Sequence, residues 1–100
     1  MYAGTFKTSD SANHYLFYWF FKTIKPNAPL VVWLNGGPGF SSIWGLFVEN
    51  GPITISREGS ESDYDNFVVQ LNPEGSWADE ANIVFVDQPV GTGFAYGTPL

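Results

Sequence analysis

The 100-residue sequence contains no cysteine and few charged side chains, which make up only 14% of the total. Without cysteine the chain forms no disulfide framework of its own and no cysteine-based metal site. Four residues are basic and ten are acidic, which gives a formal net charge of −6. Nucleic acid is therefore excluded as a partner, because phosphate binding requires clustered lysine and arginine. No group of side chains has the spacing of metal ligands, and no cofactor is expected.

Long apolar runs are also missing. The longest, residues 15–21, is far shorter than the roughly 20 residues that cross a bilayer, so we expect no membrane span. What the chain does have is the composition of a protein interior, with 44% hydrophobic and 18% aromatic residues. Ordinary soluble domains carry about 25% charged residues, well above this chain. We interpret the chain as a buried part of a larger body.

Two apolar runs without polar alternation indicate the fold class. Residues 30–34 (LVVWL) and 83–86 (IVFV) are typical of strands covered on both faces, as in a parallel sheet. The first run ends in the glycine-rich residues 35–39, and a short helix is predicted over residues 43–49, capped by Ser41 or Ser42. Strand, glycine loop, helix and strand in this order predict an α/β fold.

The other segments predict further strands. Residues 2–8 and 14–23 form an expected antiparallel pair, separated by a turn at residues 10–13. Residues 53–56 and 67–71 are expected minor strands on either side of a polar loop at residues 57–66, and residues 73–82 are a turn region. Since most segments are predicted strands, a small all-β binding module is an alternative, although the two non-alternating runs favour the covered parallel sheet.

The glycine loop is the first candidate for chemistry. Gly36 and Gly37 follow a strand directly, and their backbone N–H groups are not covered by a Cβ, so a ligand oxygen can approach closely. Pro38 stiffens the loop through its fixed φ. A rigid set of N–H donors is what an oxyanion hole requires, and in α/β-hydrolases one donor comes from the loop after the third strand. A plain glycine-rich turn is the alternative for this motif alone.

Five segments together resemble the serine carboxypeptidases of the α/β-hydrolase superfamily. They are YLFYWFF (15–21), LVVWLNGGPGFSS (30–42), GLFVENGP (45–52), NPEGSW (72–77) and VFVDQPVGTGFAY (84–96). The resemblance implies that residues 1–100 are an incomplete domain, the N-terminal portion of an α/β-hydrolase sheet. Two positions depart from the family pattern: Phe40 stands where the family usually has a disulfide-forming cysteine, and Ala95 stands where it usually has serine.

The same resemblance implies roles for five residues. Gly37 would give the oxyanion hole a backbone N–H, while Asn35 and Gly36 would bind the free α-carboxylate of a peptide. Glu49 would join this network with a second carboxylic acid outside the chain, and Trp33 would buttress it. A protonated Glu49 can donate a hydrogen bond to a carboxylate, whereas an ionised one repels it, so such a site works best in acid. A solvated residue at a helix end is the alternative for Glu49.

The catalytic triad has no candidate in these residues. No G-x-S-x-G nucleophile motif occurs, and Ser41 and Ser42 match non-nucleophilic serines of the family. We interpret His14 as structural or exposed, and Asp87 as a residue that shapes the following loop. We therefore expect the chain to be inactive alone.

The resemblance implies that the complete protein removes C-terminal residues from peptides at acid pH through an acyl-enzyme. Its partners would be peptide or protein C-termini and the rest of its own chain. Its location would be the lysosome or vacuole, or outside the cell, reached through the secretory pathway. Two alternatives within the same family are an acyltransferase and a non-catalytic member that acts as a binding protein.

Overall fold

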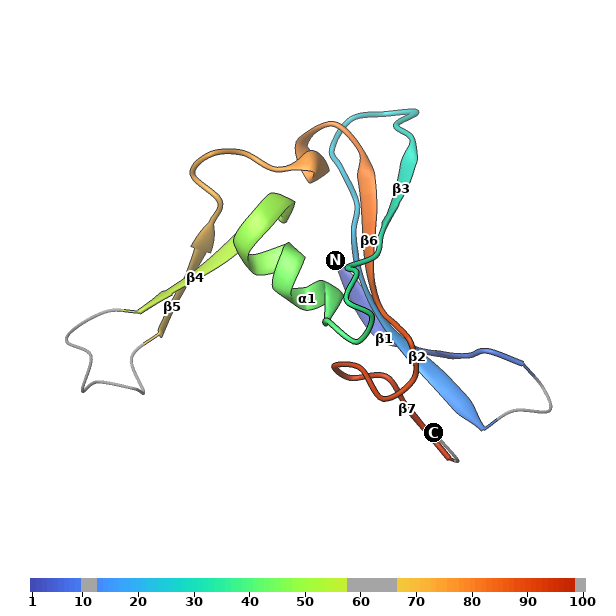
Figure 1. The fold of residues 1–100 in the computed structure, drawn as a ribbon. Coiled ribbons are helices and arrows are strands. Elements are labelled where there is room, and N and C mark those ends of the chain that lie inside the picture. The colour runs from blue at the N-terminus through green and yellow to red at the C-terminus, as the bar shows by residue number, and fades with distance from the viewer. Residues whose placement is uncertain (10–12, 58–66, 99–100) are drawn as a thin grey trace.

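The computed structural model describes residues 1–9, 13–57 and 67–98, and its centre is a five-stranded mixed sheet (Figure 1). The strand order is β1 (Tyr2–Lys7), β2 (His14–Phe21), β6 (Asn82–Asp87) and β3 (Leu30–Trp33). The first three are antiparallel neighbours, whereas β3 runs parallel to β6. A two-residue strand, β7 (Tyr96–Gly97), pairs with the start of β2.

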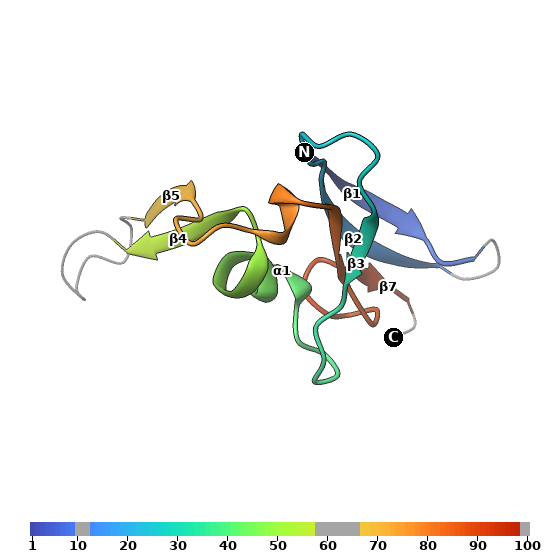
Figure 2. The same cartoon turned by 90° about the horizontal axis from the view of Figure 1, so that it is seen from above.

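One face of the sheet is covered by a short helical segment. An α-helical turn, α1 (Ser42–Gly45), continues into a π-helical turn, η1 (Leu46–Asn50). Figure 2 shows this segment lying against one side of the sheet. The strands alternate their side chains between faces, and those facing the helix form the core. The fully or nearly fully buried members are Phe21, Leu46, Ile83 and Phe85.

A second, two-stranded sheet lies on the other side of the helical segment (Figure 1). It consists of β4 (Ile53–Arg57) and β5 (Phe67–Leu71), which pair antiparallel. A 3-10 turn, η2 (Trp77–Asp79), then leads the chain back to β6. The hairpin projects away from the main sheet, and the radius of gyration is 15.3 Å, compared with about 13 Å for a compact domain of this length.

The opposite face of the main sheet is apolar but open. Tyr2, Phe6, Leu30 and Val32 project from that face, because they share its register with Phe20 and Val84. They are 65%, 44%, 64% and 55% exposed, respectively. Apolar side chains gathered on one sheet face are typical of a surface that another layer covers in a larger domain.

The order of elements predicted from the sequence is confirmed, and it is that of an α/β fold. The parallel pairing of β3 with β6 is not the arrangement of an open antiparallel module. Within the described residues, no helix is long and apolar enough to span a membrane. The predicted turn at residues 10–13 and the loop at 57–66 lie largely outside the described residues.

Three details differ from the sequence-based expectation. β3 was expected to be covered on both faces, but among the described residues it is the last strand of the main sheet and has one open face, whereas β6 lies between β2 and β3 and is mostly buried. The single predicted helix is an α-turn followed by a π-turn. β7 was not predicted at all, since two residues carry no periodic pattern and form a strand only by pairing with β2.

Candidate substrate-binding site

The glycine loop connects β3 to α1 and lies on the surface. Gly36 and Gly37 are both exposed, and neither N–H donates a hydrogen bond to any other described residue. Gly37 has φ of 129°, a conformation that residues with a Cβ rarely adopt. The loop is closed by the N–H of Phe40, which donates to the carbonyl of Gly36 at 3.3 Å. The loop therefore presents backbone donors to solvent in a fixed arrangement.

Every polar group of Asn35 except its side-chain nitrogen forms a hydrogen bond within the protein. Its backbone N–H donates to Ser42 Oγ at 3.0 Å, and its carbonyl accepts from Gln88 Nε2 at 3.0 Å. Its side-chain Oδ1 accepts from Trp33 Nε1 at 2.6 Å. Because Oδ1 is occupied, the amide orientation is fixed, and Nδ2 remains as the donor available to a ligand.

The helix approaches this pair closely at Gly45, which is buried. A Cβ built on Gly45 would lie 2.5 Å from Trp33 Nε1 and 2.6 Å from Asn35 Oδ1. Both distances are well below an ordinary van der Waals contact of 3.4–4 Å. Glycine at this position thus allows the helix to pack directly on the hydrogen bond between Trp33 and Asn35.

Asp87 anchors the far end of the loop. Its side chain is fully buried, and its Oδ1 accepts from Ser41 Oγ at 2.6 Å and from the N–H of Ser42 at 2.8 Å. Its Oδ2 accepts from the N–H of Phe94 at 3.0 Å. Three donors satisfy the carboxylate without any cation, as buried carboxylates require. The shaping role expected for Asp87 agrees with these contacts, which join β6 to the start of α1.

The two serines after the loop are used by the scaffold. Ser41 is the N-cap of α1: its Oγ accepts from the N–H of Ile43 at 3.2 Å while it donates to Asp87. Ser42 is fully buried and accepts from Asn35. Neither hydroxyl is placed as a free nucleophile, and the one histidine of the sequence, His14, lies in β2 beside β7.

Glu49 lies in η1 and is exposed, which leaves its carboxyl open to solvent. The next residue, Asn50, is buried, and its carbonyl accepts from Ser76 Oγ at 2.9 Å. The side-chain amide of Asn50 has no hydrogen-bond partner among the described residues. The structure thus fixes the backbone beside Glu49 while its side chain stays exposed. Across the described ranges, no three histidine or acidic side chains are grouped to hold a metal.

Three residues of this site were not given their role in it from the sequence. Gly45 was quoted only as part of a motif, and Ser42 and Gln88 contact Asn35 through hydrogen bonds that sequence spacing does not reveal. A signal was present for Gly45 alone, because a glycine inside a helix lowers its stability and often has a packing reason.

Comparison with known proteins identifies relatives of this chain. The family model described as serine carboxypeptidase matches residues 1–99. Carboxypeptidase Y homolog A of Trichophyton rubrum is 46% identical over 97 residues, which cover 95% of this chain and 16% of that protein. Pheromone-processing carboxypeptidase KEX1 of Ogataea parapolymorpha is 44% identical over 104 residues, covering 96% of this chain and 16% of that protein.

A solved carboxypeptidase structure has the same fold over the matched residues. Kex1(Δ)p, a prohormone-processing carboxypeptidase from Saccharomyces cerevisiae, superimposes with a TM-score of 0.72 at 38% identity. The match covers 92% of this chain and 20% of that one. The chain thus spans between 16% and 20% of the length of these three proteins.

Proposed function

Because this chain belongs to the serine carboxypeptidase family, we propose that it forms the substrate-binding half of a carboxypeptidase active site. Asn35, Gly36 and Glu49 bind the free α-carboxylate of a peptide, and Trp33 holds Asn35 in place. The N–H of Gly37 stabilises the oxyanion that develops on the scissile carbonyl. The nucleophile and the general base come from the remainder of the complete protein.

The observation that carries this proposal is the way Asn35 is bound. Its N–H, its carbonyl and its Oδ1 are all occupied by protein groups, so only Nδ2 is left to meet a ligand. Immediately after it come the exposed N–H groups of Gly36 and Gly37. Two neutral donors, Nδ2 of Asn35 and the N–H of Gly36, suit a carboxylate that must be recognised without a permanent positive charge, and the N–H of Gly37 is left for the oxyanion.

The nature of the donors favours acid conditions. The described site contains no lysine or arginine, so nothing in it offsets the charge of an ionised Glu49 beside a carboxylate. A protonated Glu49 donates a hydrogen bond and removes the repulsion. Binding of a free C-terminus is therefore strongest in acid, which fits an acidic compartment of the secretory pathway such as a lysosome or vacuole.

In the proposed reaction the chain's own groups bind and orient. The α-carboxylate is fixed by Asn35, Gly36 and Glu49, which places the last peptide bond over the loop. The N–H of Gly37 then donates to the carbonyl oxygen as it gains negative charge during attack by the serine of the complete protein. A single oxyanion donor of this kind contributes about 10²–10³ in rate.

The test compares free-acid and C-terminally amidated peptides in the complete protein. Asn35→Ala is expected to lower kcat/KM for free acids by about 1–3 kcal/mol, roughly 5- to 150-fold, because a ligand oxygen loses its partner. The amides should change little. Gly37→Val should depress both substrates together, since it displaces the oxyanion donor. An equal effect of Asn35→Ala on both substrates, or no preference for free acids in the unaltered protein, refutes the proposal.

A further inference from the structure

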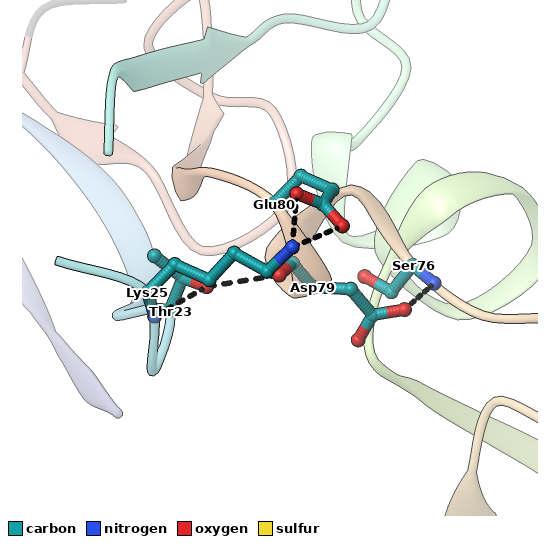
Figure 3. Close-up of polar contacts among 5 residues, drawn as sticks. All are labelled: Thr23, Lys25, Ser76, Asp79 and Glu80. Atoms are coloured by element: carbon teal, nitrogen blue, oxygen red, sulfur yellow. Dashed lines mark hydrogen bonds and ion pairs between the residues drawn. The ribbon is translucent and has the colours of Figure 1, made fainter. Parts of the chain in front are cut away.

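The turn formed by Ser76 and η2 lies beside the candidate site, and it is rigid in itself. Ser76 Oγ accepts from the N–H of Ala78 at 3.0 Å, while the N–H of Ser76 donates to Asp79 Oδ2 at 2.9 Å. The two bonds form a reciprocal capping box around a single helical turn. Figure 3 shows Ser76 and Asp79 facing each other in this arrangement.

On its outer side the turn is tied to the segment after β2. Thr23 Oγ1 donates to the carbonyl of Asp79 at 3.2 Å, and Lys25 Nζ contacts both oxygens of Glu80 at 2.6–2.7 Å (Figure 3). Thr23 is buried. The hydrogen bond of Thr23 therefore fixes the turn to the segment just after β2, and the exposed ion pair of Lys25 and Glu80 adds only a small further contribution.

On its inner side the same turn contacts both parts of the site, namely Trp33, which binds Asn35, and the backbone next to Glu49. The ring of Trp77 meets the ring of Trp33 edge to face, with centroids 5.5 Å apart and planes at 90°. Ser76 Oγ donates to the carbonyl of Asn50, the residue after Glu49, at 2.9 Å. A separate hydrogen bond from Asn72, which precedes the turn, holds the residue after Asn50: Asn72 Nδ2 donates to the carbonyl of Gly51 at 3.0 Å.

We propose that Ser76 and Trp77 are positioning residues for the carboxylate-binding site. Trp77 limits the rotation of the Trp33 ring and so keeps Trp33 Nε1 on Asn35 Oδ1. Ser76 fixes the carbonyl that follows Glu49 and so sets where the Glu49 side chain leaves the backbone. This inference rests on the proposed function. It means that one short turn holds both Asn35 and the backbone next to Glu49 in position.

The geometry explains why both residues act indirectly. Trp77 is 52% exposed, so little of the core depends on it, and the Trp33 ring that it contacts carries the hydrogen bond to Asn35. Neither Ser76 nor Trp77 lies in the loop that offers donors to a ligand. Their loss is therefore expected to weaken binding of the carboxylate while leaving the oxyanion donor of Gly37 in place.

The experiment uses the complete protein with paired free-acid and amidated peptides, measuring kcat and KM separately, together with thermal unfolding. Trp77→Leu is expected to raise KM for free acids about two- to tenfold, the range for losing an edge-to-face ring contact. The kcat should change less than twofold, and amides should be unaffected. Trp77→Phe, which keeps a ring, should recover part of the loss. Tyr96→Leu is the matched control, since Tyr96 is an aromatic of similar exposure, 53% compared with 52%, and has one ring neighbour, Tyr15.

Ser76→Ala and Ser76→Thr test the contact between Ser76 and the carbonyl of Asn50. Ser76→Ala should also raise KM for free acids alone, and Ser76→Thr should restore it, because threonine keeps the hydroxyl. Equal losses on acids and amides, or an unchanged KM in well-folded Trp77→Leu and Ser76→Ala proteins, overturn the positioning role. If Trp77→Leu fails to fold, the Ser76 pair and Trp77→Phe decide the matter.

The outcome also separates this inference from the proposed function. If Asn35→Ala abolishes the preference for free acids while the Ser76 and Trp77 variants keep it, the carboxylate site stands and the positioning role falls. If the unaltered protein shows no such preference, the proposed function itself has failed.

Discussion

Replacing Gly45 by alanine is expected to disturb substrate binding more than stability. The new Cβ would lie 2.5 Å from Trp33 Nε1 and 2.6 Å from Asn35 Oδ1, whereas the closest ordinary contacts are near 3.4 Å. Helix and ring must therefore separate by about 0.9 Å, the difference between 3.4 Å and 2.5 Å. The Trp33 ring has little room to yield, because Trp77 lies against it edge to face.

Two effects on stability oppose each other in this variant. Alanine is favoured over glycine inside a helix by about 1 kcal/mol. Inserting a methyl group into a well-packed position costs about 1–3 kcal/mol. The net loss is then about 0–2 kcal/mol, which lowers the melting temperature of the complete protein by a few degrees at most.

The effect on function is expected to be larger. A displacement near 1 Å in a positioning residue can cost about 10² in rate, so kcat/KM for free-acid peptides should fall at least tenfold and that for amides much less. Gly4→Ala is the matched control, because its Cβ would meet only the end of a tyrosine side chain, Tyr18, at 3.3 Å. A higher melting temperature with an unchanged ratio of acid to amide activity would refute the close approach.

Three further predictions concern the chain and the complete protein. The isolated 100-residue chain should lack peptidase activity. It should also bind a hydrophobic dye and unfold without cooperativity, because Val32 and its neighbours leave one sheet face open and burial of each apolar side chain contributes about 1.5–3 kcal/mol to stability. A sharp thermal transition without dye binding would contradict this. Glu49→Gln in the complete protein should make kcat/KM for free-acid peptides less dependent on pH and leave kcat/KM for amides unchanged, because glutamine donates a hydrogen bond at every pH. An equal loss on both substrates at all pH values would show that Glu49 is a structural residue. Asp87→Asn should lower the free energy of unfolding by about 1–3 kcal/mol, because either the buried N–H of Ser42 or the partly buried N–H of Phe94 then faces an amide donor. An unchanged melting temperature would disprove the anchoring role of Asp87.

Much of the site was accessible from the sequence because motifs are local. Trp33, Asn35, Gly36 and Gly37 occupy one strand end and the loop after it, so their proximity follows from the chain itself. A serine cap for α1, at Ser41 or Ser42, was also predicted, because serine is common at the start of a helix, and the structure shows that Ser41 is the cap. The contacts of Gln88 and Ser76 were not, because both reach across more than 25 residues of sequence.

The sequence by itself determined the order of the elements, the family and the position of the candidate loop. Apolar runs, glycines and capping residues act over a few neighbours, and this range is enough to define strands, turns and motifs. Only the tertiary structure decided that β6 rather than β3 is the buried central strand, and that Asp87 and Gly45 fix the loop and the helix against each other. The physical reason is that burial and hydrogen-bond partners depend on which segments meet in space, and neither strand order nor the close packing of Gly45 on Trp33 and Asn35 is encoded in local periodicity.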